Sequence, residues 1–148
     1  MPVRAFSVAV LLLLACLLTP GIARADDCLP VVREGWVRLP PTQMPMMAGF
    51  GRIENACAAQ VAVVSARSPA FAAVELHETR VVDGVSRMRH VPELRIDAGD
   101  AAVLKPGGLH LMLMRPQSMP QAGDRVAIEL ELADGRTLRT EFEVREPL

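Results

Sequence analysis

Apolar and polar residues alternate over short runs along most of this chain, which is the pattern of strands that bury one face. Turn-forming residues separate the runs at spacings of roughly eight to twelve positions, and almost no segment has helical spacing. One strand is expected to begin within 44–50 and to continue to 55; the others cover 31–39, 61–66, 74–82, 85–91, 109–114, 125–132 and 137–144, with short strands near Ile96 and at 103–104. The pattern predicts a single all-β domain, a sandwich or a barrel.

An Asp-Gly pair at 83–84 lies between two of these runs and predicts a tight hairpin, because both central residues of such a turn need positive φ. Counting outward from a two-residue loop pairs Thr79 with Met88 and His77 with His90. Side chains alternate between the two faces of a strand, so the two histidines and the methionine are expected on one face.

The segment 106–114 carries the most specific chemistry in the chain. Leu109, Leu111 and Leu113 are expected to enter a core, which leaves the opposite face to an imidazole and two thioethers: His110, Met112 and Met114. Thioether sulfur is soft and imidazole is a borderline ligand, so this face suits Cu(I) better than hard cations. The alternative is a half-buried strand in which methionine only fills gaps.

Three further methionines, Met44, Met46 and Met47, lie in a proline-containing loop that enters the second strand. Proline excludes a regular helix there. A role in soft-metal binding and a role in packing are both open for these side chains. Trp36, the only tryptophan, is expected in the core because aromatic side chains bury large areas.

The first 25 residues have the form of a secretory signal peptide. Arg4 precedes an apolar run over 8–18, and Ala-Arg-Ala at 23–25 is a small-x-small cleavage site. The run is too short for a membrane span. We expect cleavage after 25 and a functional domain over 26–148. As an alternative, residues 13–16 (LLAC) resemble a lipobox, which would place a lipidated Cys16 at the N-terminus.

Charge and cysteine content narrow the function further. Removing Arg4 and Arg24 from the 16 basic residues leaves 14 against 17 acidic ones, a net charge of −3. The chain has no basic stripe or polybasic segment, so neither nucleic acid nor an anionic membrane is an expected partner.

Two cysteines, Cys28 and Cys57, remain after cleavage. Export favours a disulfide between them, which could contribute about 3–4 kcal/mol.

Four residues, His77, Met88, His110 and Met112, follow the spacing His-x10-Met-x21-His-x-Met. This spacing resembles, residue for residue, the metal-site signature of the periplasmic copper chaperone family called PCuAC. The resemblance implies a cupredoxin-like β-sandwich or barrel that binds Cu(I) through these four residues. It also implies a periplasmic metallochaperone that delivers copper to the copper-site subunit of cytochrome c oxidase and exchanges it with thiol-bearing partners.

The resemblance extends beyond the four spaced residues to the segments 74–78, 88–89 and 104–112. Several candidate side chains lie outside the signature: His90, Met114, Met44, Met46, Met47 and the two cysteines. The signature therefore gives them no role in the metal site; for His90 an auxiliary metal role and a plain surface position both stay open, and the expected disulfide is a feature of this chain.

Other functions fit the residues less well. A blue-copper electron carrier needs a cysteine ligand, and the segment 106–114 contains none. His77-Glu78 begins like the helix of a zinc protease, but no second histidine follows at the required spacing. No nucleophile has an evident base, so we expect no enzyme. The remaining alternatives are a secreted β-sandwich binding module without metal and a copper-storage or resistance protein.

Overall fold

The protein, represented by a computed structural model, is described over residues 27–147, and within that range it contains strands and no helix. The strands are β1 (Val31–Arg38), β2 (Met46–Glu54), β3 (Val61–Arg67), β4 (Phe71–Val82), β5 (Val85–His90), β6 (Leu94–Ile96), β7 (Ala101–Leu104), β8 (Leu109–Pro116), β9 (Arg125–Leu132) and β10 (Thr137–Arg145). The all-β prediction is confirmed. The described part of the chain offers no helix that could cross a membrane. The predicted signal peptide, with Cys16, lies outside the described residues.

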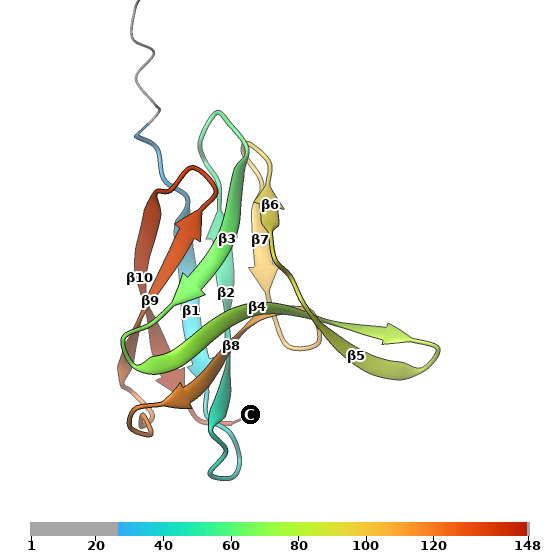
Figure 1. Cartoon of the computed structure of the whole chain (residues 1–148), viewed down its shortest axis with the longest axis vertical. Helices are drawn as coiled ribbons and strands as arrows, with labels where there is room; N and C mark the ends of the chain where they lie inside the picture. Colours follow the sequence, from blue (N-terminus) through green and yellow to red (C-terminus); the bar gives the residue numbers. More distant parts are fainter. Residues whose placement is uncertain (1–26, 148) are drawn as a thin grey trace, which may run out of the picture.

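The strands close into a barrel because β3 pairs with β9 on one side and with β4 on the other. From β4 the order continues through β8, β2, β1, β10 and β9 back to β3. The short strands β6 and β7 extend the sheet beside β3 and β2. Figure 1 shows β4 and β8 crossing the body of the barrel, with the β4–β5 hairpin projecting from it.

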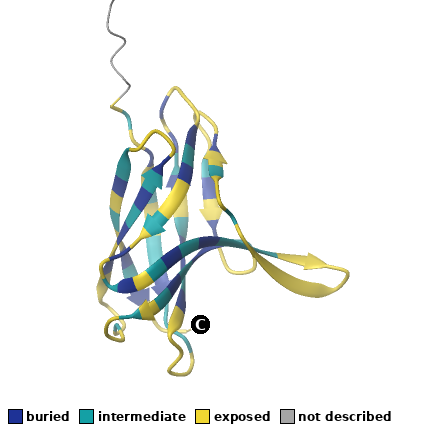
Figure 2. Cartoon of the chain, in the orientation of Figure 1, coloured by how far each residue is buried: buried dark blue, intermediate teal, exposed yellow. Residues whose placement is uncertain are grey.

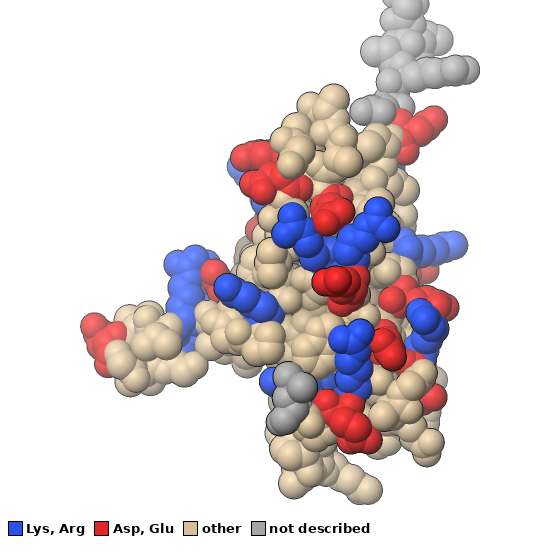
Figure 3. Space-filling model, turned by 180° about the vertical axis from the view of Figure 1, so that it is seen from behind, with Lys and Arg blue, Asp and Glu red and all other residues tan. Residues whose placement is uncertain are grey.

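The alternating pattern places the core inside this barrel. Leu111 and Leu113 are fully buried, as predicted, while Leu109 is half-buried at the start of β8. Figure 2 shows buried residues concentrated in the barrel body and exposed residues along the projecting hairpin. In Figure 3 basic and acidic side chains alternate across the face behind, without a stripe of one sign, as the near-balanced charge predicts.

The prediction that Trp36 lies in the core is wrong. The register of β1 against β2 shifts between Arg33 and Trp36, and Glu34 has a φ of 52° at this bulge. An extra residue exchanges the two faces of a strand. Val37 therefore takes the buried position, and Trp36 lies half-buried on the outside of the barrel. There its ring packs against Phe50 with centroids 4.8 Å apart.

The β4–β5 hairpin has the predicted two-residue turn and the predicted register. Asp83 and Gly84 have φ values of 52° and 76°, as a type I′ turn requires. Thr79 pairs with Met88, and His77 pairs with His90. Every residue of β5 is exposed, so the turn rather than burial holds this strand in register.

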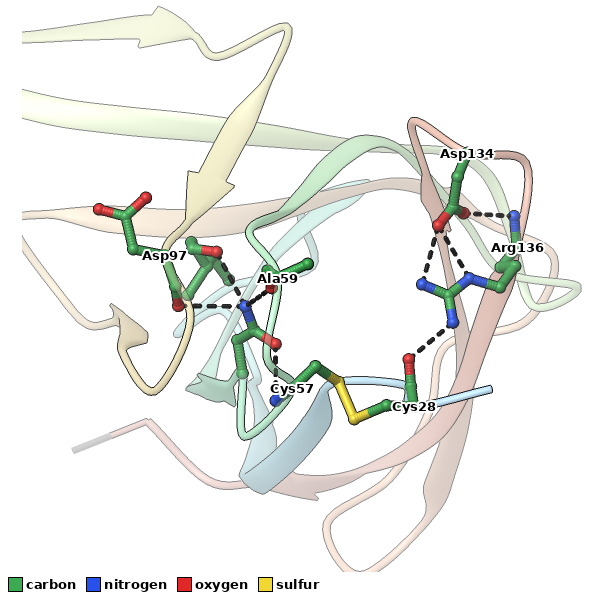
Figure 4. Close-up of a disulfide and its surroundings, with 8 residues drawn as sticks. Cys28, Cys57, Ala59, Asp97, Asp134 and Arg136 are labelled. Carbon is green, nitrogen blue, oxygen red and sulfur yellow. Dashed lines mark hydrogen bonds and ion pairs between the residues drawn. A yellow bond between two sulfur atoms is a disulfide. The ribbon is translucent and has the colours of Figure 1, made fainter. Parts of the chain in front are cut away.

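A disulfide ties the N-terminal segment to the loop after β2, which confirms the pairing of Cys28 with Cys57 (Figure 4). The two Cα atoms are 5.7 Å apart. The Arg136 guanidinium donates a hydrogen bond to the Cys28 carbonyl at 2.6 Å. The buried Asn55 side chain accepts one from the Cys57 backbone N–H at 3.1 Å. Both half-cystines are thus held by the surrounding loops.

Removing the disulfide should lower the free energy of unfolding by about 3–4 kcal/mol, because the unfolded chain regains the freedom of a long loop. Urea unfolding of the Cys28→Ala/Cys57→Ala double variant against the wild type measures this. As a control, a reductant should destabilise the wild type and leave the double variant unchanged. Two alkylated thiols in exported protein, found by intact mass without reductant, would contradict the disulfide.

Candidate metal site

A row of aromatic rings crosses five neighbouring strands on the outside of the barrel. Adjacent centroids are 4.8 Å apart for Trp36–Phe50, 6.4 Å for Phe50–His110, 6.2 Å for His110–His77 and 5.7 Å for His77–His90. Only 6% of the His110 surface is exposed although the residue faces away from the core. We call these five residues the aromatic row. It creates a second, small buried region outside the barrel.

Strand pairing places His77 at the centre of the three histidines. β4 lies between β5 and β8, and His77 is opposite His90 on one side and His110 on the other. A metal–nitrogen bond of about 2 Å puts a ring centroid roughly 3 Å from the ion, so two rings sharing one ion lie up to about 6 Å apart. The His77–His110 spacing of 6.2 Å is close to this limit, and the His77–His90 spacing of 5.7 Å also lies within it.

Met88 reaches over β4 from the projecting hairpin to His110. Its Sδ lies 3.3 Å from His110 Nε2. His110 Nδ1–H donates to the Gly108 carbonyl at 2.9 Å, so in the neutral ring Nε2 carries a lone pair. A thioether has no proton to donate, so two lone pairs face each other. A soft cation between them would satisfy both, which is the arrangement that a Cu(I) ligand pair needs.

His77 also has one nitrogen held and one nitrogen free. Its Nε2–H donates to Glu75 Oε2 at 2.9 Å, and this hydrogen bond is the main reason that the pKa of Glu75 lies below its usual value. Its Nδ1 is buried without a hydrogen-bond partner. Leaving a buried nitrogen unpaired is costly, and coordination would remove that cost. A carboxylate that orients a ligating imidazole is a recurring feature of metal sites.

Met112 lies beside this group. It is two residues beyond His110 on the same face of β8, opposite Glu75 on β4 and Ala48 on β2. The structure thus brings His77, Met88 and His110 together, and we call these three residues the histidine site. Among residues 27–147 no cluster of three or more histidine, cysteine, aspartate or glutamate side chains is placed to hold a metal.

Two supporting residues were missed by the sequence analysis although their spacing could have revealed them. Glu75 lies two positions before His77, which puts both side chains on one face of β4. Gly108 lies in the bend just before β8 and offers its backbone carbonyl to His110. The Gly107 φ of 75° forms the turn that presents the Gly108 carbonyl to His110. The contact between Phe50 and His110 could not be found from sequence spacing, because the two residues lie on different strands, β2 and β8, that come together only in the folded sheet.

A profile of the family described as "LpqE-like: Putative lipoprotein LpqE-like" matches residues 31–144 of this chain. The chain belongs to the LpqE-like family. Among the relatives of this LpqE-like chain, "Putative lipoprotein Lxx21020" of Leifsonia xyli subsp. xyli (strain CTCB07) is 35% identical over 120 residues. The alignment covers 80% of this chain and 69% of the relative.

Solved structures with the same fold include two of DR1885 from Deinococcus radiodurans. The one described as CuI-DR1885 is 28% identical, covers 83% of each chain and has a TM-score of 0.66. The apo form is 25% identical, covers 100% of this LpqE-like chain and 95% of the other, and has a TM-score of 0.63. A copper-bound PCuAC domain from PmoF2 is 16% identical, with a TM-score of 0.64 and coverage of 78% and 92%. The LpqE-like chain therefore has the fold of PCuAC domains, and the expected cupredoxin-like class is confirmed.

Replacing Glu75 with glutamine should weaken the binding of a soft monovalent ion about 10- to 100-fold, because the partner that orients His77 loses its charge. Glu78→Gln is the matched control, since Glu78 is on the same strand but faces away and pairs with Arg80 and Arg89. A competition titration with Cu(I) measures both variants. Wild-type affinity in Glu75→Gln, or an equal loss in Glu78→Gln, would show that the carboxylate has no role at the site.

Proposed function

We propose that this protein is a copper chaperone that binds one Cu(I) ion outside the cytosol through His77, Met88, His110 and Met112. The observation that carries the proposal is the pair of unprotonated atoms, His110 Nε2 and Met88 Sδ, 3.3 Å apart. The His77 ring, whose Nδ1 is buried without a partner, has its centroid 6.2 Å from that of His110. Met112 completes the set from the same face of β8 once the thioether turns toward His110.

The donor set suits Cu(I) outside the cytosol for chemical reasons. Neutral imidazole and thioether bind the ion without losing a proton, and thioethers cannot be oxidised to a disulfide as paired thiolates can. Cys28 and Cys57 are already joined, so they do not compete for the ion. The Cu(I) form of DR1885, at 28% identity, supports the same cargo for this chain.

The position of Met88 suits release as well as binding. This ligand is 53% exposed and belongs to the hairpin whose exposed residues project from the barrel in Figure 2, while His110, which it contacts, is only 6% exposed. A partner's thiolate can therefore attach to the ion as the Met88 thioether leaves, and copper remains Cu(I) throughout. By resemblance to PCuAC proteins, the proposed recipients are the copper-site subunit of cytochrome c oxidase and thiol-bearing transfer partners.

The proposed location is the periplasm, with 1–25 as the leader and 26–148 as the copper-binding domain. The family description and the name of the Leifsonia relative both contain the word lipoprotein, which supports the alternative start at a lipidated Cys16. The mass of the N-terminal peptide of the exported protein separates the two: an unmodified Asp26 supports release, and a lipid-modified Cys16 supports a tether.

A variant pair tests the function most simply. His77→Ala should lower Cu(I) affinity by more than about a hundredfold, since losing a ligand costs more than losing its hydrogen-bond partner. His90→Ala is the matched control, because His90 is across the same strand pair but exposed and outside the signature. The readout is competition with a Cu(I) chelator. Absence of stoichiometric uptake by the wild type would favour a metal-free binding module, and equal losses in both variants would contradict the assigned ligands.

A further inference from the structure

A hollow lined partly by thioethers and partly by the apolar segment 39–41 and Pro147 lies next to the histidine site on the same outer face of the barrel. Its volume is about 390 Å³, and its walls include Met44, Met46, Ala48, Met112 and Arg38. We call these five residues the methionine hollow. Met112, the fourth proposed Cu(I) ligand, is therefore also part of this second feature.

Strand pairing explains why the surface is hollowed there. Arg38, Ala48 and Met112 lie in one row across β1, β2 and β8. The small side chain of Ala48 separates two long ones and leaves a depression between them. Met46, two residues before Ala48 on the same face of β2, and Met44, from the loop before it, supply further walls.

The methionines near the start of β2 point to different sides of the sheet. Met47 points inward and is only 3% exposed, so it is a packing residue. Met44 and Met46 are 42% and 39% exposed at the hollow. Exposed thioethers contribute little to a core, whereas thioethers that line one hollow offer a set of soft ligands.

We propose that the methionine hollow is a second Cu(I) site, held by the thioethers of Met44, Met46 and Met112, and that it loads the histidine site. That the ion bound here is Cu(I) rests on the proposed function. Met112 is shared by both sites, so an ion in transfer exchanges dative bonds on a ligand that it keeps. When the histidine site is already filled and Met112 is engaged there, Met44 and Met46 alone hold a second ion. No proton or electron is transferred.

Charge and ligand type make this second site the weaker of the two. All three donors are neutral, and no imidazole takes part. The Arg38 guanidinium, which stacks over the Phe50 ring at 5.2 Å from its centroid, adds a positive charge at the wall. A cation is bound less tightly beside a like charge. Copper should therefore pass from the hollow toward the histidines, and harder ions such as Zn(II) should not bind in the hollow.

The test uses the full chain labelled with ¹³C at the methionine methyl groups and titrated with Ag(I), a redox-stable analogue of Cu(I). The first equivalent should shift the Met88 and Met112 signals, and a second should shift those of Met44 and Met46. Met119, 43% exposed but outside the hollow, is the internal control and should not move.

Substitutions by leucine nearly conserve volume, so the variants should fold. Met44→Leu/Met46→Leu should take up one equivalent fewer than the wild type, and Met119→Leu should take up the same amount. A His77→Ala/His110→Ala variant should keep the Met44 and Met46 shifts, because the hollow does not need the imidazoles.

The outcomes separate this inference from the proposed function. If the Met88 signal responds and the Met44 and Met46 signals stay still, the second site is overturned and the histidine site stands. If Met44 and Met46 respond and Met88 does not, the histidine site fails and the second site stands. If none of the three responds, both are overturned.

Discussion

The pairing of His77 with His90 on one side and His110 on the other is the constraint on which the proposed site depends. A slip of one residue in either pair would turn every side chain of that strand to the opposite face. Two turns prevent it. Asp83-Gly84 sets the register of β5 with positive φ at both residues, and the Gly107 turn sets the entry into β8. Backbone geometry at two short loops thus decides which side chains can share an ion.

The histidine site combines two largely buried histidines with the exposed Met88. His77 Nδ1 lacks a partner and His110 Nε2 faces a thioether, so the metal-free protein carries polar atoms that are not satisfied. Each unsatisfied buried group costs about 1–3 kcal/mol, and this cost is removed when an ion binds. Met88 remains accessible on the hairpin, which gives a partner a place to begin exchange. In the proposed function, affinity and release therefore come from different residues.

Local patterns predicted much of this molecule. The Asp-Gly turn gave the hairpin register, and two exported cysteines gave the disulfide. Features that depend on contacts between distant strands could not be predicted from local sequence patterns. Trp36 moved to the outside because of the bulge at Glu34, which no simple alternation reveals. His110 is buried because Phe50 and Met88 reach it from strands that are distant in the sequence and come together only in the folded sheet. The sequence spacing also grouped Met112 with the other three proposed ligands, whereas the structure places it beside them.

The ligand set itself is the central claim, and X-ray absorption at the copper edge tests it most directly. The protein should be loaded with less than one equivalent of Cu(I), so that the tighter site fills first. The account predicts scattering from nitrogen and sulfur in equal number, from two imidazoles and two thioethers. A shell without sulfur, or one made only of sulfur, would contradict it.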